Sequence, residues 1–304
     1  MARVLFVFLD GVGIGTADPG RNPFLEARLP VLRELLGGRI PTLDHPSIHF
    51  TGEREAAAFP LDATLGVAGL PQSGTGQTAL LTGENGAERF GRHFGPWVPV
   101  ALRPVVEERS VLRRVVEEGR PAVFANAYPR EWALKWGTRR IAGAPLAARA
   151  AGLLTREQSE LAQGRAVSSE IVNDRWRARW PEDDIPDVTA EDAGRTLADL
   201  AGTADLTFYA HYTTDIAGHR GSADECRKAL ERVDGFLGGI LAGLPEDHLL
   251  LVGSDHGNVE DLQAGHTRNP ALGLLVGPGA HRRAAGLSSL MDPAPAILGW
   301  LERD

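Results

Sequence analysis

The sequence predicts one α/β domain: a mostly parallel central sheet with helices on both faces and a small inserted segment. Short apolar runs of the length of buried strands recur along the chain. Amphipathic helical patterns separate these runs, and this alternation is typical of parallel sheets wrapped by helices. At 304 residues, with 43% hydrophobic and 24% charged residues, the chain is long enough to bury a core without disulfides.

The first predicted strand is Val4–Leu9, a continuous apolar run that ends at Asp10 and Gly11. Apolar, β-branched runs of this kind are typical of strands that are buried on both faces. Four later runs have the same character and predict four more strands: Ala122–Ala125, Leu206–Ala210, Leu249–Val252 and Leu272–Val276.

Three helices are predicted from their first residues. Ser110 can cap a helix that Gly119 closes, and Thr189 opens a second one. Ser222 and Glu225 have the spacing of a capping box, in front of apolar residues that recur at helical intervals.

Residues 129–186 break this alternation and form the expected insertion. They hold four of the six tryptophans and many arginines. The tryptophans Trp132, Trp136, Trp176 and Trp180 could build a small core of their own, since aromatic side chains dominate core burial. Alternatively the segment overhangs the active site as a cap, with arginines that bind phosphate oxygens.

Charge and cysteine content exclude several classes of protein. A net charge of −8 argues against a general nucleic-acid or anionic-membrane binder. The single cysteine, Cys226, excludes an intramolecular disulfide and a cysteine-rich zinc site. The first apolar run is too short for a signal peptide, and no run reaches the roughly 18 residues of a spanning helix. We therefore expect a cytoplasmic protein with no membrane partner; the sequence does not indicate its oligomeric state.

Polar side chains with metal-binding chemistry follow or adjoin the predicted strands. Because chemistry in such sheets lies at the carboxyl ends of the strands, we expect these side chains at one edge. Each alone has an ordinary explanation, such as a strand-ending turn or a solvated Asp–His pair. The set comprises Asp10, Ser73, Asp215, His219, Asp255, His256 and His266.

Together these residues form an oxygen and nitrogen ligand set that suits Zn²⁺, Mn²⁺ or Mg²⁺. Two such divalent metal ions could hold the attacking and leaving oxygens of a phosphoryl displacement, which makes a small phosphorylated molecule the expected substrate. Ser73 lies in a glycine-punctuated turn before a helical segment, where backbone N–H groups favour a phosphate. Ser73 is therefore the expected nucleophile, with Thr75 as the alternative.

The ordered series of motifs resembles the alkaline phosphatase superfamily, and within it the branch of cofactor-independent phosphoglycerate mutase and phosphopentomutase. The resemblance rests on Leu9-Asp10-Gly11-Val12-Gly13, Gly69-Leu70-Pro71 with Ser73, Asp215-x-x-Gly218-His219, Ser254-Asp255-His256-Gly257-Asn258 and His266-Thr267-x-Asn269-Pro270. It implies an alkaline-phosphatase-like fold and two metal centres. One would use Asp215, His219 and His266; the other would use Asp10, Asp255 and His256 with the Ser73 oxygen. It also implies a phosphoserine intermediate on Ser73.

The sequence departs from the mutase pattern around the nucleophile. The mutases have Asn-Ser-Glu and a histidine shortly after it, whereas this chain has Gln72-Ser73-Gly74 and then Gln77. It also lacks the large mutase insertion, and keeping an intermediate for retransfer requires the exclusion of water.

These departures favour a two-metal phosphomonoesterase. The alternatives are a phosphomutase with a reduced cap, a phosphodiesterase and a metal-binding module without catalysis. A sulfatase is disfavoured, because Ser73 is not followed by the Pro-x-Arg context of that family.

Several other polar residues are candidates for supporting roles. Arg268, Arg92 and His93 lie near the motifs in sequence and could contact the substrate. Asn258 and Glu260 could orient the ligands that precede them, since metal ligands need hydrogen-bonded partners.

Overall fold

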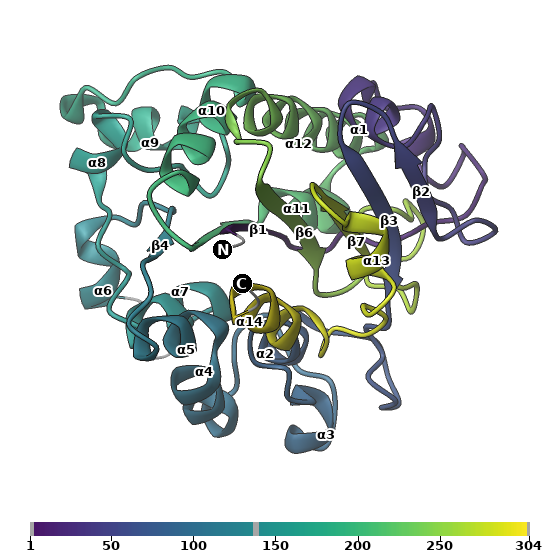
Figure 1. Cartoon of the computed structure of the whole chain (residues 1–304), viewed down its shortest axis with the longest axis horizontal. Coiled ribbons are helices and arrows are strands. Elements are labelled where there is room, and N and C mark those ends of the chain that lie inside the picture. The colour runs from purple at the N-terminus through teal and green to yellow at the C-terminus, as the bar shows by residue number, and fades with distance from the viewer. Residues whose placement is uncertain (1–2, 136–139, 303–304) are drawn as a thin grey trace.

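The computed structural model describes residues 3–135 and 140–302, with the side chains of 133–135 left aside. Its centre is a seven-stranded sheet with the order β2-β3-β7-β6-β1-β5-β4 (Figure 1). The strands are β1 (Arg3–Leu9), β2 (Ile48–Thr51), β3 (Glu55–Leu61), β4 (Ala122–Phe124), β5 (Leu206–His211), β6 (His248–Ser254) and β7 (Ala271–Val276). All five predicted strands are present, with small differences at their ends.

The sheet is parallel on one side and antiparallel on the other. Strands β6, β1, β5 and β4 run parallel to one another. Strand β7 is antiparallel to both β6 and β3, and β2 is antiparallel to β3. The mostly parallel sheet is thus confirmed, with a hairpin and a reversed strand added along one side.

Strands β2 and β3 were not predicted. Strand β3 has the sequence EAAAFPL, in which alanine and proline are poor strand formers. It forms nevertheless, because it pairs with β7 along six residues and its alanines are buried. Burial between two neighbouring strands here outweighs weak local preference.

The three predicted helix starts are confirmed. Ser110 caps α5 (Val111–Glu117) by accepting from the backbone N–H of Arg113. Thr189 and Ser222 open α10 (Ala190–Ala201) and α12 (Ala223–Gly243), each through a capping box. The remaining α-helices are α1 (Pro30–Leu35), α2 (Ser73–Thr82), α3 (Gly86–Phe90), α4 (Arg103–Arg109), α6 (Arg130–Lys135), α7 (Gly143–Ala150), α8 (Gln158–Ala162), α9 (Asp174–Arg179), α11 (Thr213–Arg220), α13 (Ala280–Ala284) and α14 (Pro293–Glu302).

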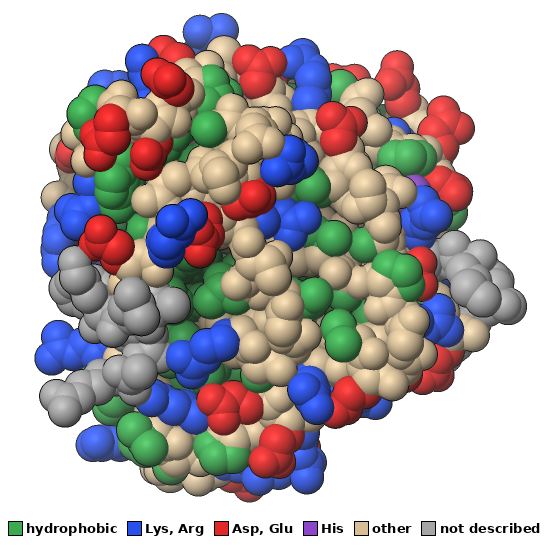
Figure 2. All heavy atoms as spheres, turned by 90° about the vertical axis from the view of Figure 1, so that its left-hand side faces the viewer, with side chains coloured by type: hydrophobic (Ala, Val, Ile, Leu, Met, Phe, Trp, Pro, Cys, Tyr) green, Lys and Arg blue, Asp and Glu red, His purple; other side chains and the backbone are tan. Residues whose placement is uncertain are grey.

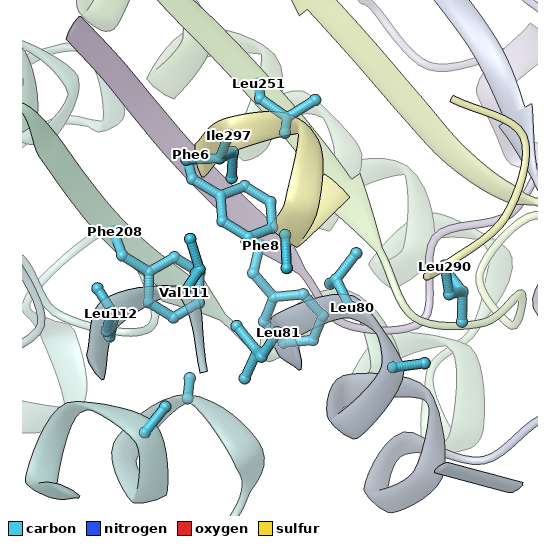
Figure 3. Close-up of a cluster of buried hydrophobic side chains, with 14 of the residues drawn as sticks. Phe6, Phe8, Leu80, Leu81, Val111, Leu112, Phe208, Leu251, Leu290 and Ile297 are labelled. Carbon is cyan, nitrogen blue, oxygen red and sulfur yellow. The ribbon is translucent and has the colours of Figure 1, made fainter. Parts of the chain in front are cut away.

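Helices cover both faces of the sheet, as Figure 1 shows. Alternate side chains of β1 supply the two cores: Phe6 and Phe8 point to one side, Leu5 and Val7 to the other. The first core contains residues of α2, α5, α7 and α14, and Figure 3 shows Phe6, Phe8 and Phe208 packed there with Leu80 and Leu81. The second contains residues of α1, α10 and α12. The sheet is thereby fixed between two apolar layers, with its polar edge left for the site.

Residues 129–186 are built from several pieces. Helix α7 belongs to the main core, where Leu146 is fully buried. Trp176 and Trp180 lie in a separate small cluster with Leu161 and Ile185, and Trp132 packs against the main core. Trp136 lies outside the described residues.

Several arginines of this segment form ion pairs with nearby carboxylates. The ion pairs are Arg130–Glu157, Arg165–Glu160, Arg175–Glu170 and Arg177–Asp187. Figure 2 shows basic and acidic side chains interspersed over this side of the molecule. These arginines already have carboxylate partners, so a role of the segment as a substrate-binding cap stays a prediction. Among the described helices, none combines the length and the apolar character that a membrane span requires.

Candidate metal centre and nucleophile

The predicted ligands meet at one edge of the sheet. Asp10 follows β1, and Asp255 and His256 follow β6. Helix α11 starts after β5 and carries Asp215 and His219 one turn apart. His266 precedes its strand, yet it reaches the same edge because β7 runs antiparallel to β6.

His256 lies at the centre of the cluster. Its Nε2 atom is 3.3 Å from Asp10 Oδ1, 3.7 Å from Asp255 Oδ1 and 3.9 Å from Asp215 Oδ1. The same Nε2 atom lies 3.0 Å from Ser73 Oγ. One imidazole is thus within about 4 Å of three carboxylates and a hydroxyl, and both the His256 and Asp255 side chains are fully buried.

Two groups of three side chains have the spacing needed to hold a metal ion. One is Asp10, Asp255 and His256, which is the set expected beside Ser73. The other is Asp215, His256 and His266. His219 adjoins the second group, with Nε2 at 2.9 Å from His266 Nε2 and 3.5 Å from Asp215 Oδ2, and its side chain is 43% exposed.

The electrostatics of the cluster favour a bound cation. Burial, and then the charge of Asp255, raises the pKa of Asp10 well above its ordinary value, and burial likewise raises the pKa of Asp255. Burial alone would lower the pKa of His256, but the carboxylates of Asp255 and Asp10 outweigh it and raise that pKa to about 10. Burial, together with the charge of His256, lowers the pKa of His266 to about 4.

Buried carboxylates this close together need a positive partner. In addition, Asp10 Oδ1 is buried and accepts no hydrogen bond from the described residues. Carboxylate oxygens and imidazole nitrogens are donors that Zn²⁺ and Mn²⁺ accept. The residues present therefore fit divalent metal ions.

Glu260 ties three of the ligand segments together. Its Oε2 accepts from the backbone N–H groups of Gly13 and Asn258, at 3.0 and 2.7 Å. Its Oε1 accepts from the Thr267 hydroxyl at 2.6 Å and from Asn269 Nδ2 at 3.0 Å. This buried carboxylate thus connects the loop after β1, the loop after β6 and the loop before β7.

Two amide side chains orient individual aspartates. Asn258 Nδ2 donates to Asp215 Oδ1 at 2.7 Å. Gln77 Nε2 donates to Asp255 Oδ2 at 3.1 Å, while its Oε1 accepts from the Gly143 N–H at 2.8 Å. The sequence marked Gln77 only as a departure from a pattern, because nothing local indicates that it joins α7 to the predicted ligand Asp255.

Ser73 is the first residue of α2 and lines the cavity over the cluster. Thr75 is fully buried: its hydroxyl donates to Gln72 O and accepts from the Phe94 N–H, each at 3.2 Å. The Thr75 N–H donates to Phe94 O, whereas neither Ser73 nor Gly74 has an acceptor for its N–H among the described residues. The hydroxyl that faces the ligand cluster is therefore that of Ser73, and the N–H groups without an acceptor among the described residues are those of Ser73 and Gly74.

The cavity has a volume of about 850 Å³. Besides Ser73, Asp215, His219 and His266, it is lined by Gln72, Gly95, Pro96, Ile216, Arg220, Ala264 and Gly265. Arg268, Arg92 and His93 are not among its lining residues: Arg92 stacks over Phe90, and His93 Nε2 lies 3.3 Å from Val67 O. Sequence reasoning missed Arg220, which directly follows the ligand candidate His219.

One family model matches the part of the chain that holds most of the predicted ligands. Residues 182–298, which include Asp215, His219, Asp255, His256 and His266, match the model of the Metalloenzyme superfamily. This match covers the part of the chain that carries β5, β6 and β7, and that part is similar to the metalloenzyme superfamily. The resemblance inferred from the motifs is thereby confirmed.

The curated relatives are larger proteins. A 2,3-bisphosphoglycerate-independent phosphoglycerate mutase of a Ruegeria species is 31% identical over 218 residues, which cover 62% of this chain and 40% of the relative. The mutase of Desulforudis audaxviator is 34% identical over 105 residues, or 32% and 21% of the two chains. The matches thus span about a fifth to two fifths of these relatives.

Solved structures share the fold over the whole chain. The PH0037 protein of Pyrococcus horikoshii is 15% identical with a TM-score of 0.60, covering 100% of this chain and 97% of its own. The alkaline phosphatase of the Antarctic bacterium TAB5 is 11% identical with a TM-score of 0.51, covering 99% and 98%. The alkaline-phosphatase-like fold expected from the sequence is therefore confirmed.

Proposed function

We propose that this protein is a phosphomonoesterase of the metalloenzyme superfamily that works through a phosphoserine intermediate on Ser73. The observation that carries the proposal is the position of the Ser73 hydroxyl, 3.0 Å from His256 Nε2 within a cluster that fits two divalent metal ions. Asp10, Asp255 and His256 would hold one ion beside the Ser73 oxygen. Asp215, His219 and His266 would hold the other, with His256 close to both.

Bound divalent metal ions supply Lewis-acid activation of the hydroxyl and stabilisation of the negative charge that develops in phosphoryl transfer. The residues of the chain supply the remaining requirements. Ser73 provides the oxygen that attacks phosphorus, and the free N–H groups of Ser73 and Gly74 point the positive end of α2 toward the phosphoryl oxygens. Gln77 and Asn258 fix the orientation of Asp255 and Asp215, so that little reorganisation accompanies the reaction.

Hydrolysis is favoured over retransfer because the cavity is broad and its described walls carry no large domain. Water can reach the phosphoserine from a cavity of this size, and a mutase has to exclude it. A phosphomutase with a reduced cap is the second proposal, and the 31% identity to a phosphoglycerate mutase over 218 residues is the observation that supports it.

The test is phosphate release from a panel of phosphate monoesters by the Mn²⁺- or Zn²⁺-loaded protein, alongside Ser73→Ala. We expect wild type to release phosphate and Ser73→Ala to release none. The metal content of the Asp215–His219–His266 site should be unchanged in this variant. A control variant, Thr75→Ser, keeps a hydroxyl at the buried position and should retain activity. Release that persists in Ser73→Ala contradicts the proposal, and isomerisation without free phosphate supports the mutase instead.

A further inference from the structure

Arg220 lies where two cavities meet. It is the last residue of α11 and directly follows His219. Ile216 and Arg220, one helical turn apart, line both the cavity over Ser73 and a second cavity of about 370 Å³. Asp215 and His219, also one turn apart, face the ligand cluster. One face of α11 thus carries the predicted ligands Asp215 and His219, and the adjacent face carries the Arg220 guanidinium.

The Arg220 guanidinium has no partner among the described residues, in contrast to Arg175 and Lys228 beside the second cavity. It is exposed and forms no hydrogen bond or ion pair within 3–135 and 140–302. Around it, Arg175 pairs with Glu170 at 3.2 Å and Lys228 pairs with Asp224 at 2.7 Å. Among the residues that line the cavity over Ser73, Arg220 is also the sole lysine or arginine. The positive charge of Arg220 is therefore available to an anion in this cavity.

Charge balance indicates which anion it suits. Two divalent ions would exceed the charge of Asp10, Asp215 and Asp255 by one. A phosphate monoester carries two negative charges near neutral pH, so its binding leaves one negative charge that Arg220 can offset. A phosphate diester carries one negative charge fewer than the monoester, so it gains less from the positive charge of Arg220. Guanidinium groups also match phosphate geometry, since they donate two parallel hydrogen bonds.

We propose that Arg220 binds the phosphoryl oxygens of the substrate and makes the site selective for dianionic monoesters over monoanionic diesters. The proposal rests on the proposed function in that it takes the cavity over Ser73 as a phosphoryl site. Arg220 has no part in holding metal, so its removal should leave the ligand cluster intact.

The first experiment measures binding without turnover. Inorganic phosphate is titrated at pH 8 into the metal-loaded protein by calorimetry, for wild type and for the Arg220→Met, Arg220→Lys and Arg114→Met variants. Arg114→Met is the matched control, because Arg114 is exposed on α5 and lines neither cavity. We expect phosphate binding to weaken about tenfold to a hundredfold in Arg220→Met, the usual range for charged hydrogen bonds. Arg220→Lys should recover part of the loss, and Arg114→Met should bind as wild type does.

The second experiment compares p-nitrophenyl phosphate with bis-p-nitrophenyl phosphate, which release the same leaving group. We expect Arg220→Met to lower kcat/KM for the monoester about tenfold or more and to change it little for the diester. Phenyl phosphate and 4-carboxyphenyl phosphate then separate two sources of the anion. An equal loss for both places Arg220 on the phosphoryl group, and a loss confined to the carboxylated substrate places it on the leaving group and overturns the proposal.

The outcomes separate this proposal from the proposed function. Phosphate binding that depends on Arg220, in a protein that releases no phosphate from monoesters, contradicts the phosphatase but supports the role of Arg220. Hydrolysis with phosphate binding unchanged in Arg220→Met supports the phosphatase and overturns the role of Arg220. Absence of phosphate binding by metal-loaded wild type overturns it as well.

Discussion

Replacing Glu260 by glutamine would test whether one buried carboxylate holds the ligand loops in place. Glu260 accepts four hydrogen bonds, two at each carboxylate oxygen, and its side chain is 1% exposed. Glutamine keeps the shape but offers a single acceptor oxygen. In either orientation of the amide, two donors face an NH₂ group and lose their acceptor.

The magnitude follows from the hydrogen bonds that are lost. A hydrogen bond to a charged group contributes about 1.5–3 kcal/mol, so the loss of two predicts about 3–6 kcal/mol of destabilisation. This is a large share of the stability of a typical domain, which is about 5–15 kcal/mol. The glycines around Glu260 leave the site little room to adjust: a Cβ at Gly13 would lie 2.5 Å from the Glu260 carboxyl group, and one at Gly257 would lie 2.3 Å from Oε1.

The assay is urea unfolding of metal-free protein, together with metal affinity measured by competition with a chelator. We expect Glu260→Gln to show both the loss of stability and weaker metal binding. The matched control is Glu84→Gln, which removes the same charge from a surface carboxylate paired with Arg89 and Arg109 and should cost less than about 1 kcal/mol. Equal costs for the two variants would refute the reasoning.

Four further predictions concern other parts of the structure. Removing metal with EDTA should lower the free energy of unfolding by about 4 kcal/mol, compared with protein in free metal at a thousandfold its Kd. Thermal unfolding measures this difference, and an unchanged Tm would contradict the metal centre. Gln77→Leu should weaken metal at the Asp10–Asp255–His256 site about 10–100-fold and spare the other site, a difference that stepwise metal titration would reveal. Gly74→Ala should destabilise the protein and reduce its activity, because a Cβ there would lie 2.1 Å from Trp97 O. Stability and activity equal to those of wild type would show that residues 94–97 can move to make room for the methyl group. Burial lowers the pKa of His211 to about 3, so below pH 6.5 the unfolded chain binds a proton that the native protein does not. As the pH falls from 6.5 toward 3, the unfolding free energy of wild type should therefore drop by about 1.4 kcal/mol per pH unit more than that of His211→Gln. Parallel curves of stability against pH for the two proteins would contradict this prediction.

The sequence was most informative where local signals agree with tertiary packing. The β1 run is apolar throughout because both of its faces are buried, so its pattern predicts its position in the middle of the sheet. Ser110, Thr189 and Ser222 satisfy the first N–H groups of their helices from within the same segment. Signals of this kind need no knowledge of distant residues.

Features that depend on distant contacts were not predictable in the same way. Strand β3 is held by its pairing with β7, more than 200 residues away, and its alanines give no strand signal. Gln77 and Arg220 acquire their positions from α7 and from the cavity walls, respectively. In both cases the residue type is common and its surroundings alone distinguish it.

The direction of β7 explains how a motif that precedes a strand meets motifs that follow strands. In a sheet of parallel strands only, the residues that precede a strand lie at the opposite edge from those that follow its neighbour. His266 precedes β7, and it joins Asp255 and His256, which follow β6, because β7 is reversed. The Gly257–Thr267 bridge and the hydrogen bond from Thr267 to Glu260 then hold the two loops together. A reversed strand beside β6 is thus what brings His266, the last predicted ligand in the chain, to the cluster, and the assembly of the proposed centre depends on sheet topology as much as on the ligand residues themselves.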